Sequence, residues 1–129
     1  MNISRSSTLR QLLAGVFAAL VVTFSSAAAA DPVIRIVHLT AAGVDQQQQV
    51  MKMVDTDINK LYKAAKGCRW VKYFFDAKTL DTGSVSMWNS RADVEAFLKS
   101  DAYKPVPEKL KPLMTGSLTS QVYSVHTPK

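Results

Sequence analysis

Along this chain, apolar runs typical of strands alternate with segments whose apolar residues recur at helical spacing. This succession constrains the fold more than any other feature of the sequence. The run Val33–Leu39 is rich in β-branched residues, as strands are. Apolar residues then recur every three or four positions over about 46–66, which is one face of a helix. Asp45 is the expected N-cap of this helix, and Gly67 is expected to end it. The helical stripe consists of Val50, Val54, Ile58, Leu61 and Ala65.

The second half of the chain continues this succession. An aromatic and β-branched run, 68–75, is followed by a turn and a second run, 83–88, which together predict a hairpin. Ser90 begins a sequence that resembles a capping box, so a helix is expected to start there. Prolines limit 103–113 to short helical turns. A last strand is expected over 118–125.

The predicted order of elements is β-α-β-β-α-β, which is the α+β, ferredoxin-like split βαβ arrangement. Its spatial strand order is 4-1-3-2, and we expect strand 1 to run parallel to strand 3. Both faces of the sheet are predicted to be apolar, because Val71, Tyr73 and Phe75 alternate with Trp70 and Phe74. A domain of about 99 residues cannot cover both faces of such a sheet. The sequence therefore predicts a homodimer that associates through its sheets.

The first 30 residues are typical of a secretory signal peptide. Two arginines precede the apolar stretch Leu12–Phe24, and a run of small residues ends at Ala30. The apolar stretch is shorter than the roughly 20 residues that a membrane span needs. We therefore expect cleavage between Ala30 and Asp31, export to the periplasm or beyond, and no stable membrane anchor afterwards. Residues 1–30 are then the leader, and 31–129 form one domain.

Several classes of site are not expected. The formal net charge is +6, but the lysines are spaced as on solvated helix faces, so nucleic acid is not an expected partner. The single cysteine, Cys68, cannot form an internal disulfide and lies in an apolar run that favours burial. His38 and His126 are the two histidines, and the strand geometry separates them by on the order of 16 Å. No metal site and no cofactor are expected.

The segments around the third strand resemble a known family. Lys66-Gly67-Cys68 enters the second strand, and the third strand ends in Ser86-Met87-Trp88-Asn89-Ser90. This leads into Val94–Leu98 and then Ser100–Tyr103. Together these segments resemble the antibiotic biosynthesis monooxygenase (ABM) domain, over about residues 33–126. Most of the matching residues have architectural roles, so the resemblance indicates fold more directly than activity.

The resemblance implies a dimeric α+β barrel. Some members of the ABM family oxidise quinols or polyketide aromatics with dioxygen and without metal or flavin, and many members have no known reaction. A related branch degrades haem and binds its iron through a histidine on the helix after the third-strand tryptophan. This chain has no histidine between Arg91 and Lys104, so haem is not expected.

The candidate site is a pocket between the sheet and the helices. With strands 1 and 3 parallel, His38 and Trp88 are expected at similar heights, where they line one cavity together with Tyr103. His38 is the candidate catalytic base that deprotonates a phenol or quinol. Trp88 is expected to stack on the ring, and Asn89 or Tyr103 to hydrogen-bond an oxyanion.

Two interpretations of function stay open at this stage. The first is an exported, cofactor-independent monooxygenase of small aromatics or quinols. The second is a non-catalytic periplasmic dimer that binds a small ligand or is associated with stress. In the second, Trp88 fills the core, and His38 is a strand-edge histidine bonded to backbone. The direction of the His38 side chain distinguishes them, since a base must face the pocket.

Overall fold

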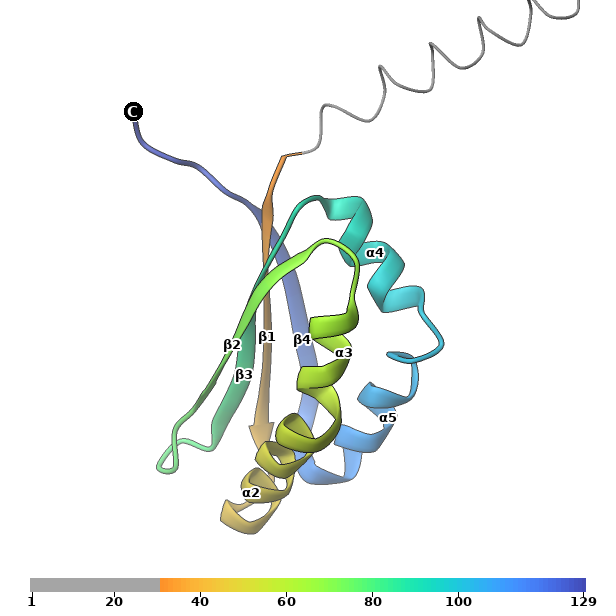
Figure 1. The fold of residues 1–129 in the computed structure, drawn as a ribbon. Helices are drawn as coiled ribbons and strands as arrows, with labels where there is room; N and C mark the ends of the chain where they lie inside the picture. Colours follow the sequence, from red (N-terminus) through yellow and green to blue (C-terminus); the bar gives the residue numbers. More distant parts are fainter. Residues whose placement is uncertain (1–30) are drawn as a thin grey trace, which may run out of the picture. The chain divides into compact units, whose positions relative to one another are not determined.

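A computed structural model describes residues 31–129, so the predicted leader lies outside the described residues. A four-stranded sheet is covered by helices on one face (Figure 1). Its strands are β1 (Val33–Ala41), β2 (Cys68–Phe75), β3 (Asp81–Trp88) and β4 (Met114–Ser124). The order of elements along the chain confirms the predicted ferredoxin-like α+β fold.

Two helical connections form the layer that covers the sheet. The first joins β1 to β2 and consists of α2 (Val44–Met53), a π-helical segment (Val54–Ile58) and α3 (Asn59–Ala64). The second joins β3 to β4 and consists of α4 (Arg91–Lys99), α5 (Pro105–Leu110) and a 3₁₀ turn (Lys111–Leu113). No helix in residues 31–129 is both long and apolar enough to cross a membrane.

The strand order is β2-β3-β1-β4, as predicted, and every neighbouring pair is antiparallel. The expectation that strand 1 runs parallel to strand 3 is wrong. The helical crossover returns β2 in the direction of β1, and the hairpin then reverses β3. Val33 consequently lies opposite Trp88, whereas His38 lies opposite Gly83 near the other end of the pair.

The first helix starts at a different residue from the expected one, because more than one residue near its start is able to precede a helix. The first helix starts at Val44 with Gly43 as its N-cap, and Asp45 lies in its first turn, where a carboxylate interacts favourably with the helix dipole. Ser90 is the N-cap of α4, as predicted, since its hydroxyl accepts a hydrogen bond from the Asp93 backbone N–H. Gly67 has a φ of 84°, which glycine adopts without strain.

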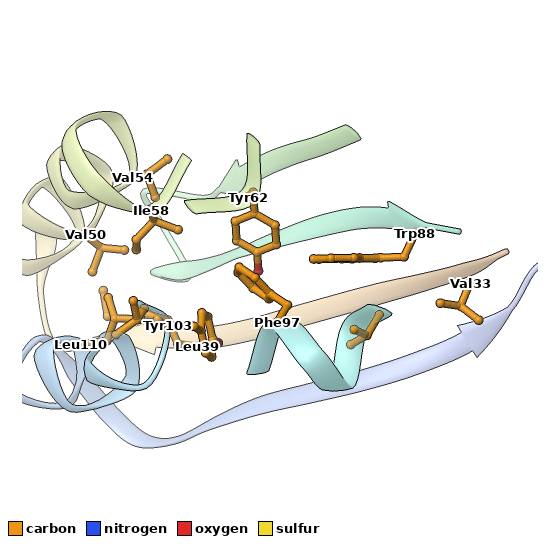
Figure 2. Close-up of a cluster of buried hydrophobic side chains, with 13 residues drawn as sticks. Val33, Leu39, Val50, Val54, Ile58, Tyr62, Trp88, Phe97, Tyr103 and Leu110 are labelled. Atoms are coloured by element: carbon orange, nitrogen blue, oxygen red, sulfur yellow. The ribbon is translucent and has the colours of Figure 1, made fainter. Parts of the chain in front are cut away.

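The hydrophobic core lies between the sheet and the helices (Figure 2). Alternate residues of β1, namely Val33, Val37 and Leu39, are buried on the helix-facing side. Trp88 is 0% exposed, and its ring packs 5.1 Å from the ring of Phe97, centroid to centroid. The predicted helical stripe also contributes to this core, with Val50, Val54 and Ile58 buried and Leu61 and Ala65 partly buried.

Candidate ligand-binding site

A small cavity lies between the sheet and the helical layer. Its volume is about 40 Å³, which is room for a few water molecules. Aliphatic side chains from β1, α2, the π-helical segment and α5 form most of its wall. The polar side chains that line it all carry hydroxyl groups and are Tyr62, Tyr73, Thr82, Ser84 and Tyr103. The cavity is therefore an apolar space with hydroxyl groups at its wall.

Arg35 lies outside the cavity lining and holds two of these hydroxyls in place by hydrogen bonds. It is 1% exposed and lies on the helix-facing side of β1. Its Nη1 donates to the Tyr62 hydroxyl at 2.7 Å, and its Nη2 donates to the Tyr103 hydroxyl at 3.0 Å. Its Nε donates to Ser120 Oγ of β4 at 2.9 Å. One planar guanidinium thus positions two phenol oxygens at the cavity wall.

The positive charge of Arg35 has no carboxylate partner within ion-pair distance among residues 31–129. Its hydrogen-bond partners are three neutral hydroxyls, and its guanidinium carbon lies 5.4 Å from the centroid of the Tyr103 ring. A cation–π contact of this kind offsets part of the cost of burial. A buried cation without a neighbouring anion is unusual, because moving a charge out of water is costly.

Two tyrosines at the cavity wall, Tyr62 and Tyr73, have raised pKa values and keep their protons. Burial raises the pKa of Tyr62, and this effect outweighs the opposing influence of the Arg35 cation. Burial also raises the pKa of Tyr73, with smaller contributions from Tyr62 and Cys68. The oxygens of Tyr62 and Tyr103 accept hydrogen bonds from Arg35, so each O–H is left to act as a donor.

Of the residues predicted from sequence, Tyr103 is the one that lines the cavity. Trp88 lies deeper in the core, where its indole N–H donates to Ser86 Oγ at 2.8 Å. It does not line the cavity. Asn89 is exposed, and its Oδ1 accepts a hydrogen bond of 2.7 Å from Arg69 Nε. The structure therefore places Trp88 as a core residue and Asn89 at the surface.

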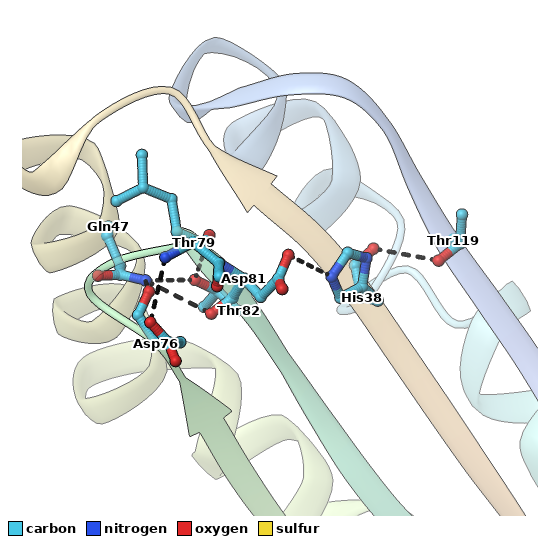
Figure 3. A network of polar contacts seen from close by, with 8 residues as sticks. His38, Gln47, Asp76, Thr79, Asp81, Thr82 and Thr119 are labelled. Carbon is cyan, nitrogen blue, oxygen red and sulfur yellow. Dashed lines mark hydrogen bonds and ion pairs between the residues drawn. The ribbon is translucent and has the colours of Figure 1, made fainter.

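His38 lies on the face of the sheet that the helices do not cover. Its Nε2 is 2.9 Å from Oδ1 of Asp81, and the two side chains are 41% and 46% exposed (Figure 3). The expectation that His38, Trp88 and Tyr103 share one cavity is wrong. Because β1 and β3 are antiparallel, His38 and Trp88 lie near opposite ends of the pair, and they also face opposite sides of the sheet.

Sequence reasoning missed Arg35, although a signal for it was present. Side chains of a strand alternate between the two faces, so Arg35 shares a face with Val33, Val37 and Leu39, and His38 belongs to the other face. One of the two polar residues therefore had to point toward the helices. The sequence did not reveal which face that was, because Ile34 and Ile36 make the second face apolar as well.

The remaining titratable groups of the described domain do not form a metal site. Within residues 31–129, no three side chains of His, Cys, Asp or Glu lie close enough to hold one metal ion. Cys68 is a free thiol of intermediate exposure, so it is less buried than the sequence predicted. Burial raises the pKa of this thiol, which lowers the share of reactive thiolate.

Comparison with known proteins shows similarity at the level of structure. No family model matches the sequence, and no curated protein matches it. The structure is similar to that of Rv0793 from Mycobacterium tuberculosis, with a TM-score of 0.65, 18% identity, and coverage of 76% of this chain and 98% of the other.

Two further similar structures are described as oxygenases. The monooxygenase ActVA-Orf6 of Streptomyces coelicolor, solved with Nanaomycin D, has a TM-score of 0.65 and 12% identity over 77% of this chain and 91% of its own. SnoaB of Streptomyces nogalater, a cofactor-independent oxygenase, has a TM-score of 0.61 and 14% identity over 77% of this chain and 97% of its own. Together with the sheet order and the helical layer, these comparisons show that the chain has the ferredoxin-like α+β fold of the antibiotic biosynthesis monooxygenases.

Proposed function

We propose that this chain is a monooxygenase of small phenols or quinols and that the cavity between sheet and helices is where the substrate binds. The observation that carries the proposal is the pairing of aliphatic walls with two tyrosine hydroxyls, Tyr62 and Tyr103, both held by Arg35. An aromatic ring suits the aliphatic walls, and its oxygen suits the paired hydroxyl donors. The structural similarity to oxygenases supports the same class of reaction.

The reaction needs no external reductant. A phenol with a free para position and one dioxygen give a para-quinone and one water. One oxygen atom becomes the new carbonyl, and the other leaves as water with the hydroxyl hydrogen and the para hydrogen of the substrate. The ring supplies all four electrons. Hydrogen bonds from Tyr62 and Tyr103 stabilise negative charge on the substrate oxygen, which makes the ring a better electron donor toward dioxygen.

The cavity must widen to admit an aromatic ring. At about 40 Å³ it is much smaller than a cavity that holds benzene, which is on the order of 150 Å³. Val54 and Ile58 of the π-helical segment line it. Segments of this kind interrupt the regular hydrogen-bond ladder and are frequent at functional sites. We therefore place the movement that admits substrate in the first helical connection.

A second candidate function is non-catalytic binding of the same class of ligand. The observation that favours it is that no imidazole or carboxylate lines the described cavity, since His38 is on the other face of the sheet. Catalysis then depends on a substrate that is acidic enough to ionise without a neighbouring base. Binding alone has no such requirement.

We further propose that the protein is exported and that it forms a homodimer. Export rests on the leader-like sequence of residues 1–30. Dimerisation is supported by the uncovered face of the sheet, which carries exposed large hydrophobic side chains on all but one of its strands. They are Ile36, Trp70, Phe74 and Tyr123.

Oxygen consumption by the purified protein with simple phenols whose para position is free tests the proposed function. We expect uptake by the wild type and by His38→Ala, and loss of uptake in the double variant Tyr62→Phe, Tyr103→Phe. Uptake that His38→Ala abolishes and the double variant keeps would place the chemistry elsewhere. Ligand binding without any uptake would favour the second candidate function.

A further inference from the structure

The cluster around Arg35 carries an inference about which form of the ligand is bound. We propose that the cavity binds its ligand as an anion, with the negative oxygen at the hydroxyls of Tyr62 and Tyr103 and its charge balanced by Arg35. This rests on the proposed function in so far as the cavity is the ligand site. It adds the substrate class, namely acidic phenols and enols, and it predicts that small carboxylates bind as ligands. It also assigns Arg35 as the residue that determines this specificity.

The charge balance of the interior is the first argument. Arg35 is 1% exposed, and no acidic side chain lies within ion-pair distance of it among the described residues 31–129. In a medium of low polarity, an unpaired cation attracts an anion more strongly than it does in water. A negatively charged ligand in the adjacent cavity supplies the missing partner.

The direction of the hydrogen bonds is the second argument. The guanidinium only donates, so the oxygens of Tyr62 and Tyr103 act as acceptors toward it. Their own protons are then available to a group in the cavity, which both side chains line. Two polarised O–H donors that converge on one space suit an oxyanion better than a neutral hydroxyl, because hydrogen bonds to ionised acceptors are about twice as strong.

Arg35 acts through the two tyrosines and is a positioning residue. It does not line the cavity, and each of its three nitrogens donates one hydrogen bond, to Tyr62, Tyr103 and Ser120. Its effect on a ligand must therefore appear as a change in the preferred ionisation state. A merely structural role would alter stability and leave that preference unchanged.

The test uses 4-nitrophenol, whose anion absorbs in the visible and whose neutral form does not. In the wild type we expect the apparent pKa of the bound probe to fall by about one unit, a tenfold preference for the anion. Arg35→Met should abolish the shift, and Arg35→Lys should keep part of it. Arg91→Met removes an exposed positive charge at the start of α4 and should behave as the wild type.

A second pair of probes is smaller than an aromatic ring, and it also serves if the Arg35→Met variant fails to fold. Acetate and acetamide have nearly the same shape and differ in charge. Acetate should raise the unfolding temperature of the wild type more than acetamide does, and the double variant Tyr62→Phe, Tyr103→Phe should lose this difference. That variant keeps Arg35 and both aromatic rings.

The outcomes separate this inference from the proposed function. A lowered pKa of bound 4-nitrophenol without oxygen uptake supports anion binding and contradicts the oxygenase. If the protein consumes oxygen but binds 4-nitrophenol in its neutral form, anion binding is contradicted and the proposed oxygenase function is not. The inference is overturned if neither 4-nitrophenol nor acetate binds. It is also overturned if Arg35→Met keeps the full pKa shift of bound 4-nitrophenol.

Discussion

At the scale of single residues, Trp88 depends on a hydrogen bond within its own strand. The indole is 0% exposed, and its N–H donates to Ser86 Oγ, two residues earlier in β3. Within residues 31–129, every buried polar side-chain atom has a hydrogen-bond partner. Removing this acceptor leaves a buried donor unsatisfied, which costs more than the bond itself contributes.

Ser86→Ala should therefore lower the free energy of unfolding by about 1–3 kcal/mol. Ser117→Ala, at an exposed position of β4, should change it by no more than about 0.5 kcal/mol. Urea denaturation of both variants measures the difference. Equal stabilities would mean that the indole finds another acceptor or water.

Tyr73 gives the stability of the protein a dependence on alkaline pH. Burial raises its pKa, so above about pH 10 the unfolded chain loses this proton more readily than the folded one. The contribution of Tyr73 to the free energy of unfolding is fully present below about pH 10 and is lost as the pH rises further. Tyr73→Phe should make the alkaline decrease in stability shallower. Unfolding measured at a series of alkaline pH values tests this, and an unchanged slope would contradict it.

The predictions for single residues succeeded where the signal was local. Ser90 was identified as an N-cap because a capping hydroxyl bonds a backbone N–H three residues away. Arg35 was missed because its partners, Tyr62, Tyr103 and Ser120, lie 27, 68 and 85 residues away in the sequence. No local pattern shows that three distant hydroxyls will meet one buried guanidinium.

At the scale of elements, the first helical connection is both a cover for the core and a wall of the cavity. Its apolar stripe was visible in the sequence, and the buried Val50, Val54 and Ile58 confirm it. The change to π-helical hydrogen bonding over Val54–Ile58 was not visible, because it preserves the apolar face while inserting one residue per turn. The sequence thus predicted the helix but missed its irregular segment.

Val54→Ala should widen the cavity and strengthen the binding of ring-sized phenols. Val94→Ala is the matched control, because Val94 is equally apolar, helical and buried but does not line the cavity. Each variant should lose roughly 2 kcal/mol of stability. Calorimetric titration with hydroquinone under nitrogen compares them. Tighter binding by Val94→Ala than by Val54→Ala would argue against this cavity as the site.

At the scale of the whole molecule, the uncovered face of the sheet is the interface of the proposed homodimer. Ile36 of β1, 38% exposed, lies on this face, and the aromatic side chains of the neighbouring strands add to its apolar area. Apolar patches of this kind on small domains commonly mark interfaces between proteins. A two-fold homodimer is the simplest assembly that covers the patch.

Ile36→Lys should convert the proposed homodimer into a monomer, because two copies of the new charge would be buried against each other. Val44→Lys places the same charge at an exposed apolar position at the start of α2 and should leave the dimer intact. Light scattering coupled to gel filtration gives the masses. A monomeric wild type, or a dimeric Ile36→Lys, would contradict the proposal.

The topology of the molecule was predicted better than its geometry. The order of periodic segments was enough to give the ferredoxin-like arrangement and the order of its strands. The relative direction of β1 and β3 was assigned wrongly, and the expectation that both side chains face the helices was wrong for His38; these two errors brought His38 and Trp88 together. The side of the sheet that each strand residue occupies depends on the packing of the whole domain, since both faces are apolar.

The central claim is that the cavity beside Arg35 is the ligand site, and the four tyrosines of the chain allow a direct test. Tyr62, Tyr73 and Tyr103 line the cavity, whereas Tyr123 lies exposed on β4. With ¹³C-labelled tyrosine rings, hydroquinone added under nitrogen should shift the NMR signals of the first three and leave that of Tyr123 unchanged. A shift confined to Tyr123 would place the ligand on the uncovered face and contradict the account.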